Sequence, residues 1–226
     1  MNISFIIKAS TNIGYGHLIR SRTLANAIQN LKHRDHVSYY IIGNSKLDVL
    51  LSKVTFDYTI FESEEELIKG FDNLKLNEVV IFDLLTAEEE LFKLARRAPT
   101  VISLSPIFNW MDSVDVLFHR TKYHNYQFNE KTQVHKGLEY TLIQETCKPI
   151  ETSSFKKHLN EEKLSIAISM GGGDAANKSL AVIKELNKLK KDYIVWLMLG
   201  QGYKYSYDEL IEESKKSRHE IILAKT

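Results

Sequence analysis

His17 is the side chain best placed for acid–base chemistry in this sequence. It closes a Gly-Tyr-Gly-His turn over residues 14–17, between an apolar run over 3–7 and an amphipathic stretch over 18–28. The run predicts a buried strand and the stretch a helix, so the imidazole lies where a parallel strand passes into a helix N-terminus. Ligands of open α/β sheets bind at such strand ends, and a helix N-terminus attracts phosphate. A base beside a phosphate site predicts an enzyme acting on a nucleotide or a sugar phosphate.

The neighbours of His17 are candidate substrate contacts. The loop before the turn supplies hydroxyl and amide groups, its glycines allow a ligand to approach the backbone, and an arginine three residues on shares the helix face of His17. These candidates are Ser10, Asn12, Gly14, Tyr15, Gly16 and Arg20. The alternative interpretation is a tight turn with a solvent-facing histidine and an ion-paired surface arginine. Ile19 stands where a dinucleotide fingerprint requires a third glycine, which disfavours a dinucleotide site.

A second glycine-rich loop follows an apolar run near residue 169 and precedes another helical pattern. Its N–H groups can cradle phosphate or sugar oxygens. The candidate phosphate-binding residues are Gly171, Gly172, Gly173, Asp174 and Asn177. Asp174 is explained equally well as a helix N-cap. The spacing does not match a P-loop, so we reject an NTPase.

Two further residues have both a functional and a structural interpretation. Asp83 ends a strongly apolar run, where an acid either contacts a ligand or anchors a loop. Tyr140 lies shortly before an interruption in the pattern, where it either lines a cleft or packs in a turn. The histidines show no paired metal-ligand spacing, so the sequence predicts no metal site and no cofactor.

The alternation of strand and helix patterns determines the expected fold. It predicts a doubly wound parallel sheet, in an N-terminal Rossmann-like domain over residues 1–147. The stretch 120–146 is irregular and carries no predicted long element. Proline, threonine and serine then indicate a linker over 148–163. The alternation restarts over 164–226, which predicts a second, incomplete Rossmann-like domain.

Composition excludes several classes of protein. The 226 residues include 30 Lys and Arg against 29 Asp and Glu, a net charge of +1 that gives no global field to attract nucleic acid or an anionic membrane. No apolar run approaches the roughly 20 residues of a membrane span, and no signal peptide is recognisable. The single cysteine, Cys147, excludes an internal disulfide framework. We therefore expect a cytoplasmic protein.

Three segments, in this order, carry a family resemblance: residues 13–20 followed by Leu24 and Ala25, residues 137–143, and residues 169–177. They resemble the nucleotide-sugar hydrolases of the pseudaminic-acid pathway, the UDP-2,4-diacetamido-2,4,6-trideoxy-β-L-altropyranose hydrolases, which are grouped with spore-coat polysaccharide proteins. The resemblance implies a GT-B-like architecture of two Rossmann-like domains with the active site in the cleft. It also implies hydrolysis of the C1–O bond of a UDP-sugar, release of UDP, and His17 as the general base that activates water. No metal is required.

The sequence departs from that family at positions expected to recognise the sugar. The usual Arg-x-Asp-x-Ser pattern reads Ile-Ile-Lys-Ala-Ser over 6–10, the Asp-x-Tyr motif reads Asp-Leu-Leu over 83–85, and an acidic pair is replaced by Leu-Ser-Pro over 104–106. The family's later Gly-rich, Glu-bearing segment has no counterpart. We therefore expect that a further C-terminal segment or a partner completes the nucleotide site, or that nucleotide binding is weak. Two alternatives stay open: a GT-B glycosyltransferase that uses a UDP-sugar donor, and a non-catalytic subunit that binds a sugar nucleotide.

Overall fold

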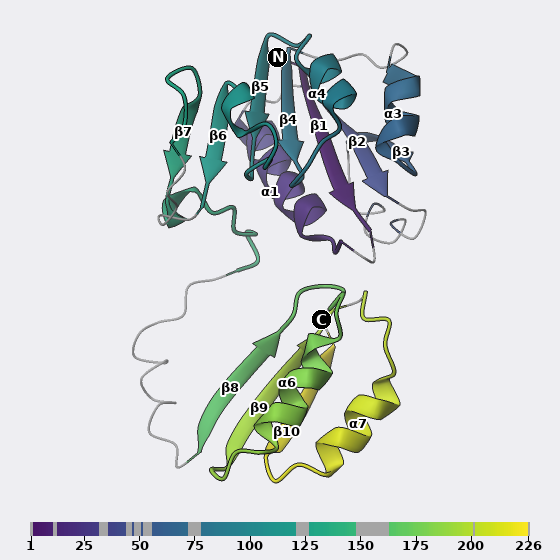
Figure 1. Ribbon diagram of the computed structural model, residues 1–226, viewed down its shortest axis with the longest axis vertical. Coiled ribbons are helices and arrows are strands. Elements are labelled where there is room, and N and C mark those ends of the chain that lie inside the picture. Colours follow the sequence, from purple (N-terminus) through teal and green to yellow (C-terminus); the bar gives the residue numbers. More distant parts are fainter. Residues whose placement is uncertain are drawn as a thin grey trace. The chain divides into compact units, whose positions relative to one another are not determined.

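The chain forms two compact units, one from residues 1–10 and 17–145 and the other from 11–16 and 146–226 (Figure 1). The computed structural model describes residues 2–10, 13–31, 36–43, 47, 51, 56–71, 78–120, 127–147, 163–200 and 202–225. Asn12 and most of the predicted linker lie outside the described residues.

The N-terminal unit is built on a seven-stranded sheet whose order is β3-β2-β1-β4-β5-β6-β7. All neighbouring strands are parallel. The strands are β1 (Asn2–Ala9), β2 (His36–Gly43), β3 (Asp57–Phe61), β4 (Val79–Asp83), β5 (Thr100–Ser103), β6 (Val116–His119) and β7 (Gln133–Lys136). Successive strands are added outward from β1 on one side and from β4 on the other. The direction of winding therefore reverses between β1 and β4, which is where sheets of this kind bind ligands.

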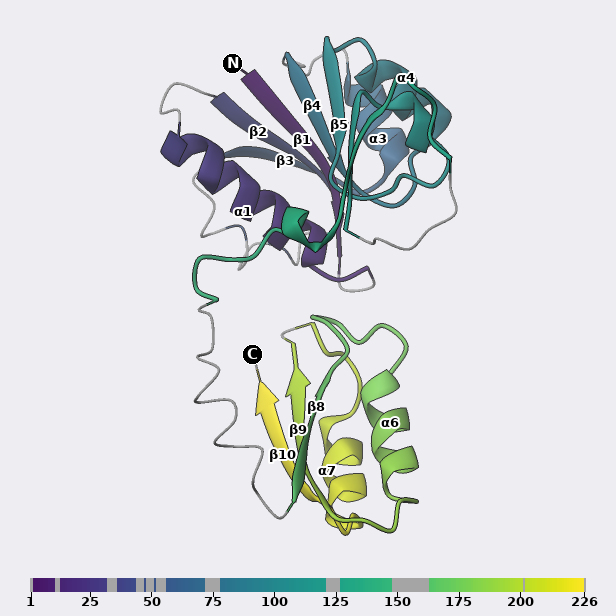
Figure 2. The same ribbon diagram turned by 90° about the vertical axis from the view of Figure 1, so that its left-hand side faces the viewer.

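The described helices lie on both faces of this sheet. Helix α1 (Gly16–Leu31) lies on one face, and α3 (Glu64–Gly70) and α4 (Glu89–Ala95) lie on the other (Figure 2). Right-handed crossovers in opposite directions along the sheet place their helices on opposite faces. On the α4 face, Phe92 stacks between Phe82 and Trp110, with ring centroids 5.9 and 4.8 Å away. The α1 face has no such aromatic stack over β4 and β5 among the described residues.

The predicted parallel α/β class is confirmed, and the differences concern short elements. The irregular stretch contains the edge strand β7 and the 3-10 turn η4 (Leu138–Tyr140), after the 3-10 turn η3 (Met111–Ser113). Strand β7 has the sequence Gln-Val-His-Lys, and none of its four side chains is fully buried. A short polar edge strand lacks the apolar run by which the other strands are recognised.

The C-terminal unit repeats the architecture on a smaller scale. Strands β8 (Leu164–Ser169), β9 (Tyr193–Leu199) and β10 (Glu220–Lys225) form a parallel sheet of order β10-β9-β8. Helices α6 (Lys178–Leu186) and α7 (Tyr207–Lys215) both cover one face of it (Figures 1 and 2). Ile183 and Leu210 of these helices are fully buried against Val195 and Leu197 of β9.

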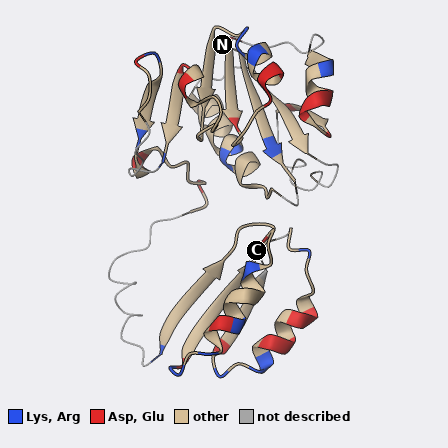
Figure 3. Cartoon of the chain, in the orientation of Figure 1, with Lys and Arg blue, Asp and Glu red and all other residues tan. Residues whose placement is uncertain are grey.

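The charges on the described helices agree with the nearly equal numbers of basic and acidic residues in the chain. Basic and acidic residues both occur on the helices of each unit (Figure 3). Within the described ranges, no helix is at once long enough and apolar enough to cross a bilayer.

We predict that Gly200→Ala destabilises the C-terminal unit. A Cβ at Gly200 would lie 2.4 Å from the Cα and 2.5 Å from the carbonyl oxygen of Gly172, so backbone must move. Overpacking of this kind costs roughly 1–3 kcal/mol, which urea unfolding will show as a lower midpoint. Gly16→Ala is the matched control, because a Cβ there meets nothing within 4 Å. Equal midpoints for the two variants would contradict the packing described.

Candidate functional site

The N-terminal unit holds a buried carboxylate at the end of β4. Asp83 is fully buried and accepts hydrogen bonds from three side chains that come from two other parts of the chain. His17 Nδ1 lies 2.8 Å from Oδ1, Arg20 Nε donates to Oδ2 at 2.8 Å, and Arg20 Nη2 also contacts Oδ1. The hydroxyl of Ser105, just after β5, lies 3.2 Å from Oδ1. The charge that would make burial costly is thereby compensated.

The fold brings these groups together at the point where winding reverses. Ile7 of β1 pairs with Asp83 of β4, so the carboxyl ends of the two strands are adjacent. The chain leaves β1 through the glycine turn and enters α1, whose first two turns carry His17 and Arg20 on one face. Of the two glycines in the turn, Gly14 has φ +91° whereas Gly16 begins the helix without a positive φ. The turn therefore requires a glycine at position 14.

Electrostatics keep Asp83 ionised. Burial by itself would raise the pKa of this carboxyl, but hydrogen bonds from His17 and Arg20, together with the positive charge of Arg20, outweigh burial and lower the pKa. A carboxylate so held only accepts hydrogen bonds.

The ionised carboxylate determines the tautomer of His17. An unprotonated Nδ1 at 2.8 Å from a carboxylate oxygen would place two lone pairs against each other, so Nδ1 carries the hydrogen and donates it to Asp83. Arg20 Nη2 lies 3.0 Å from Nδ1, and since both atoms then carry hydrogens this approach is a packing contact. In the neutral imidazole the lone pair is on Nε2. The side chain of His17 is 14% exposed, so the group is a base with restricted access to solvent.

Two residues at this edge of the sheet were missed by the sequence analysis. Ser105 stood only as a departure from the family pattern, and Arg120 lies directly after β6. The guanidinium of Arg120 is half-buried, and its pKa is lowered by burial and by the like charge of Arg20, while Asp83 acts in the opposite direction. Each is a polar residue that directly follows a predicted strand, a signal that identifies a site residue only once the strand order is known.

The other predicted contacts near His17 are placed differently. Ser10 is half-buried directly after β1, and Tyr15 is buried, with 9% of its surface exposed. Tyr140 is 37% exposed and packs against the rings of Phe118 and His135. Tyr140 lines the cavity between α1 and the sheet together with Arg20. The side chains that hydrogen-bond to Asp83 among the described residues are those of His17, Arg20 and Ser105.

In the C-terminal unit, the second glycine loop and Asp174 directly precede α6. The buried carboxylate of Asp174 accepts the backbone N–H groups of Lys178 at 2.7 Å and Ser179 at 2.9 Å, so it caps the helix. Asn177 has φ +50°, and its Oδ1 accepts a hydrogen bond from Tyr203 at 3.0 Å. Burial and the neighbouring Asp174 raise the pKa of Tyr203 to about 12, so this phenol keeps its donor hydrogen.

The glycines of that loop have distinct environments. Gly171 is exposed with φ +75°, Gly172 is half-buried, and Gly173 is buried. The carbonyl of Gly172 accepts the N–H of Gly202 at 2.8 Å, which joins the loop after β8 to the loop after β9. As for metals, no group of three or more His, Cys, Asp or Glu residues within the described ranges is arranged to hold an ion.

Comparison with curated proteins gives one remote relative. No protein-family model matches the chain. The chain is similar to an uncharacterized protein, MJ1062, of Methanocaldococcus jannaschii, with 23% identity over 218 residues that cover 93% of this chain. The matched region is 44% of that protein, so the chain spans less than half the length of this relative.

Comparison with solved structures concerns the fold. The chain is similar to MurG of Acinetobacter baumannii with a TM-score of 0.59 and 12% identity, covering 100% of this chain and 68% of that one. A weaker likeness is to ADP-heptose LPS heptosyltransferase II of E. coli, with a TM-score of 0.45 and 13% identity, covering 100% of this chain and 72% of that one. Another is to a family 9 glycosyl transferase of Veillonella parvula, with a TM-score of 0.41 and 14% identity, covering 98% of this chain and 69% of that one. The likeness to MurG agrees with the two Rossmann-like units, and the predicted GT-B-like fold class is confirmed. The resemblance to the hydrolase family stays a prediction.

We predict that Asp83→Asn lowers the free energy of unfolding of the N-terminal unit by about 3 kcal/mol at pH 7, because the partly buried side chain of Arg20 loses its counter-charge. The folded-state pKa of Asp83 is below its ordinary value. Its contribution is therefore complete above the ordinary carboxyl range and is lost as the pH falls through the lowered pKa. The difference in free energy of unfolding between the native protein and Asp83→Asn should therefore become smaller in acid. Urea unfolding at several pH values between 7 and 3 measures this difference.

Glu65→Gln is the matched control, since Glu65 pairs with Lys69 on the surface, where both side chains are 72% exposed. An exposed pair of this kind contributes little. If Asp83→Asn is as stable as the native protein at pH 7, or if the difference in free energy of unfolding stays the same down to pH 3, Asp83 is not an ionised, paired carboxylate.

Proposed function

We propose that the chain carries the catalytic base of a GT-B-type enzyme that transfers a sugar from a nucleotide-activated donor to an acceptor oxygen. The observation that carries the proposal is the Asp83–His17 pair at the reversal point of the sheet, with the Nε2 lone pair left for chemistry. A nucleotide sugar as donor is an analogy from the fold class and the sequence motifs, because folds host many activities.

The reaction uses His17 as a general base. The acceptor hydroxyl gives its proton to Nε2 as its oxygen forms a bond to the anomeric carbon. The bond from that carbon to the diphosphate oxygen breaks, and its electron pair leaves with the diphosphate. Asp83 stabilises the imidazolium that forms and fixes its orientation. Arg20 does not act on the substrate in this step: it holds the Asp83 carboxylate in place.

The glycine loop of the C-terminal unit is the proposed diphosphate-binding element. Asp174 occupies the first free N–H groups of α6, so the donors available to phosphate belong to the loop itself, residues 171–173. We assign the base to a domain over 1–147 and the phosphate loop to a domain over 164–226, joined by 148–163.

Water is the alternative acceptor, and the motifs over 13–20, 137–143 and 169–177 favour it. The same Nε2 atom would then deprotonate water and the enzyme would be a nucleotide-sugar hydrolase. A panel of UDP-sugars, with and without hydroxyl acceptors, separates the two. Nucleotide release that requires an acceptor supports transfer, release without one supports hydrolysis, and binding without release supports a non-catalytic subunit. The panel is best run on the chain together with any further segment of its reading frame.

We predict that His17→Asn reduces turnover by about 10²-fold or more, the scale of a lost general base. The asparagine amide can still donate to Asp83 near the former Nδ1 position but has no basic nitrogen, so the free energy of unfolding should change little. His36→Asn is the matched control, because His36 lies exposed at the start of β2 in the same unit. Turnover that survives His17→Asn would eliminate the assigned role.

A further inference from the structure

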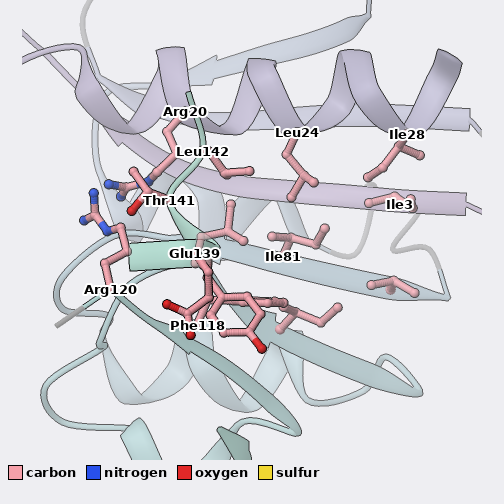
Figure 4. Close-up of a pocket in the computed structure, with 14 residues that line it drawn as sticks. Ile3, Arg20, Leu24, Ile28, Ile81, Phe118, Arg120, Glu139, Thr141 and Leu142 are labelled. Atoms are coloured by element: carbon pink, nitrogen blue, oxygen red, sulfur yellow. The ribbon is translucent and has the colours of Figure 1, made fainter. Parts of the chain in front are cut away.

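The N-terminal unit contains a cavity of about 490 Å³ between α1 and the sheet. Figure 4 shows Leu24 and Ile28 of α1 facing Ile3, Ile81 and Phe118 of the strands. The cavity begins beside Ile3, at the start of β1, and reaches the carboxyl ends of the strands four residues on, a length of roughly 13 Å. Its size is that of a small-molecule site, and most of its wall is aliphatic or aromatic.

One end of this cavity is positively charged. The guanidinium groups of Arg20 and Arg120 lie together at that end (Figure 4). Arg20 is neutralised by Asp83, whereas within the part of the chain that the structure describes, Arg120 has no hydrogen-bonding or ion-pair partner. Glu139 also lines the cavity, but its carboxylate lies against Gly137. Arg120 therefore has no direct ion-pair partner among the described residues, and only Asp83, which already pairs with Arg20, attracts it from a distance.

A partly buried guanidinium without a partner is unfavourable unless a ligand supplies the anion. Burial and the like charge of Arg20 lower the pKa of Arg120, as expected for a partly buried guanidinium without a direct anionic partner. Guanidinium groups bind phosphate and carboxylate through paired N–H donors. The apolar wall, in turn, gains free energy when an apolar group displaces water from it.

We infer that this cavity binds an anionic amphiphile, a small molecule whose apolar body lies between α1 and the strands and whose phosphate or carboxylate pairs with Arg120. The inference goes beyond the proposed function and does not rest on it, because it concerns binding within the N-terminal unit and needs no turnover. The order of the groups along the cavity fixes the orientation: the apolar end toward Ile3 and the anionic end toward Arg120.

Calorimetric titration of the whole chain with decyl phosphate, below its micelle concentration, tests the inference. We expect saturable binding to decyl phosphate and decanoate, and much weaker binding to decanol or inorganic phosphate. Each buried methylene should strengthen binding roughly fourfold. Arg120→Gln should weaken decyl phosphate binding by roughly tenfold or more, and Arg218→Gln, which alters an exposed arginine of the C-terminal unit, should not.

The position of the apolar body is tested separately. Leu24→Trp should fill the cavity and abolish binding, while Leu189→Trp on the exposed surface should not. Isoleucine methyl NMR signals give a readout that needs no variant, because Ile81 and Ile102 should shift on titration. Absence of binding, equal binding to decanol, binding that ignores Arg120→Gln, or unshifted signals of both isoleucines would each overturn the inference. A cavity filled by an apolar protein segment would give the first of these results.

Discussion

The buried carboxylate of Asp83 is the interaction on which the N-terminal site depends. An ionised carboxylate with no exposed surface is tolerated only when its charge and its lone pairs are matched. The matching groups come from the start of α1 and from the loop after β5, and the helical donors lie 63 and 66 residues away in the sequence. Ordering these segments around one carboxylate also fixes the imidazole, so the orientation of His17 follows from a requirement of folding.

The topology explains why this network forms at one edge of the sheet. Parallel strands place all their carboxyl ends together, and the reversal between β1 and β4 leaves room there because the helices depart to opposite faces. On the α1 face, side chains of β4 and β5 line the cavity that lies between α1 and the sheet. The cavity that ends at Arg120 lies on this face, so the base and the cavity have a common structural origin.

The sequence identified single residues of the site, but it did not predict which of them contact one another. His17 and Asp83 were each recognisable because a strand pattern ends beside them, and Arg20 because it lies one turn from His17. Their contact depends on the pairing of β4 with β1. These strands are far apart in the sequence, and no local sequence pattern predicts that they pair. Ser105 and Arg120 were missed for the same reason, because a polar residue after a strand acquires meaning only when the strand order is known. Edge strand β7 has too few apolar residues to be recognised, whereas the buried strands were readily predicted.

The function of this site depends on Asp83 holding His17 with its hydrogen on Nδ1 and its lone pair on Nε2. Long-range ¹H–¹⁵N correlation NMR of the imidazole, at a pH where His17 is neutral, measures this directly. We expect the Nδ1–H tautomer in the native protein and a loss of that preference in Asp83→Asn. A predominant Nε2–H tautomer in the native protein, or an identical spectrum in Asp83→Asn, would contradict it.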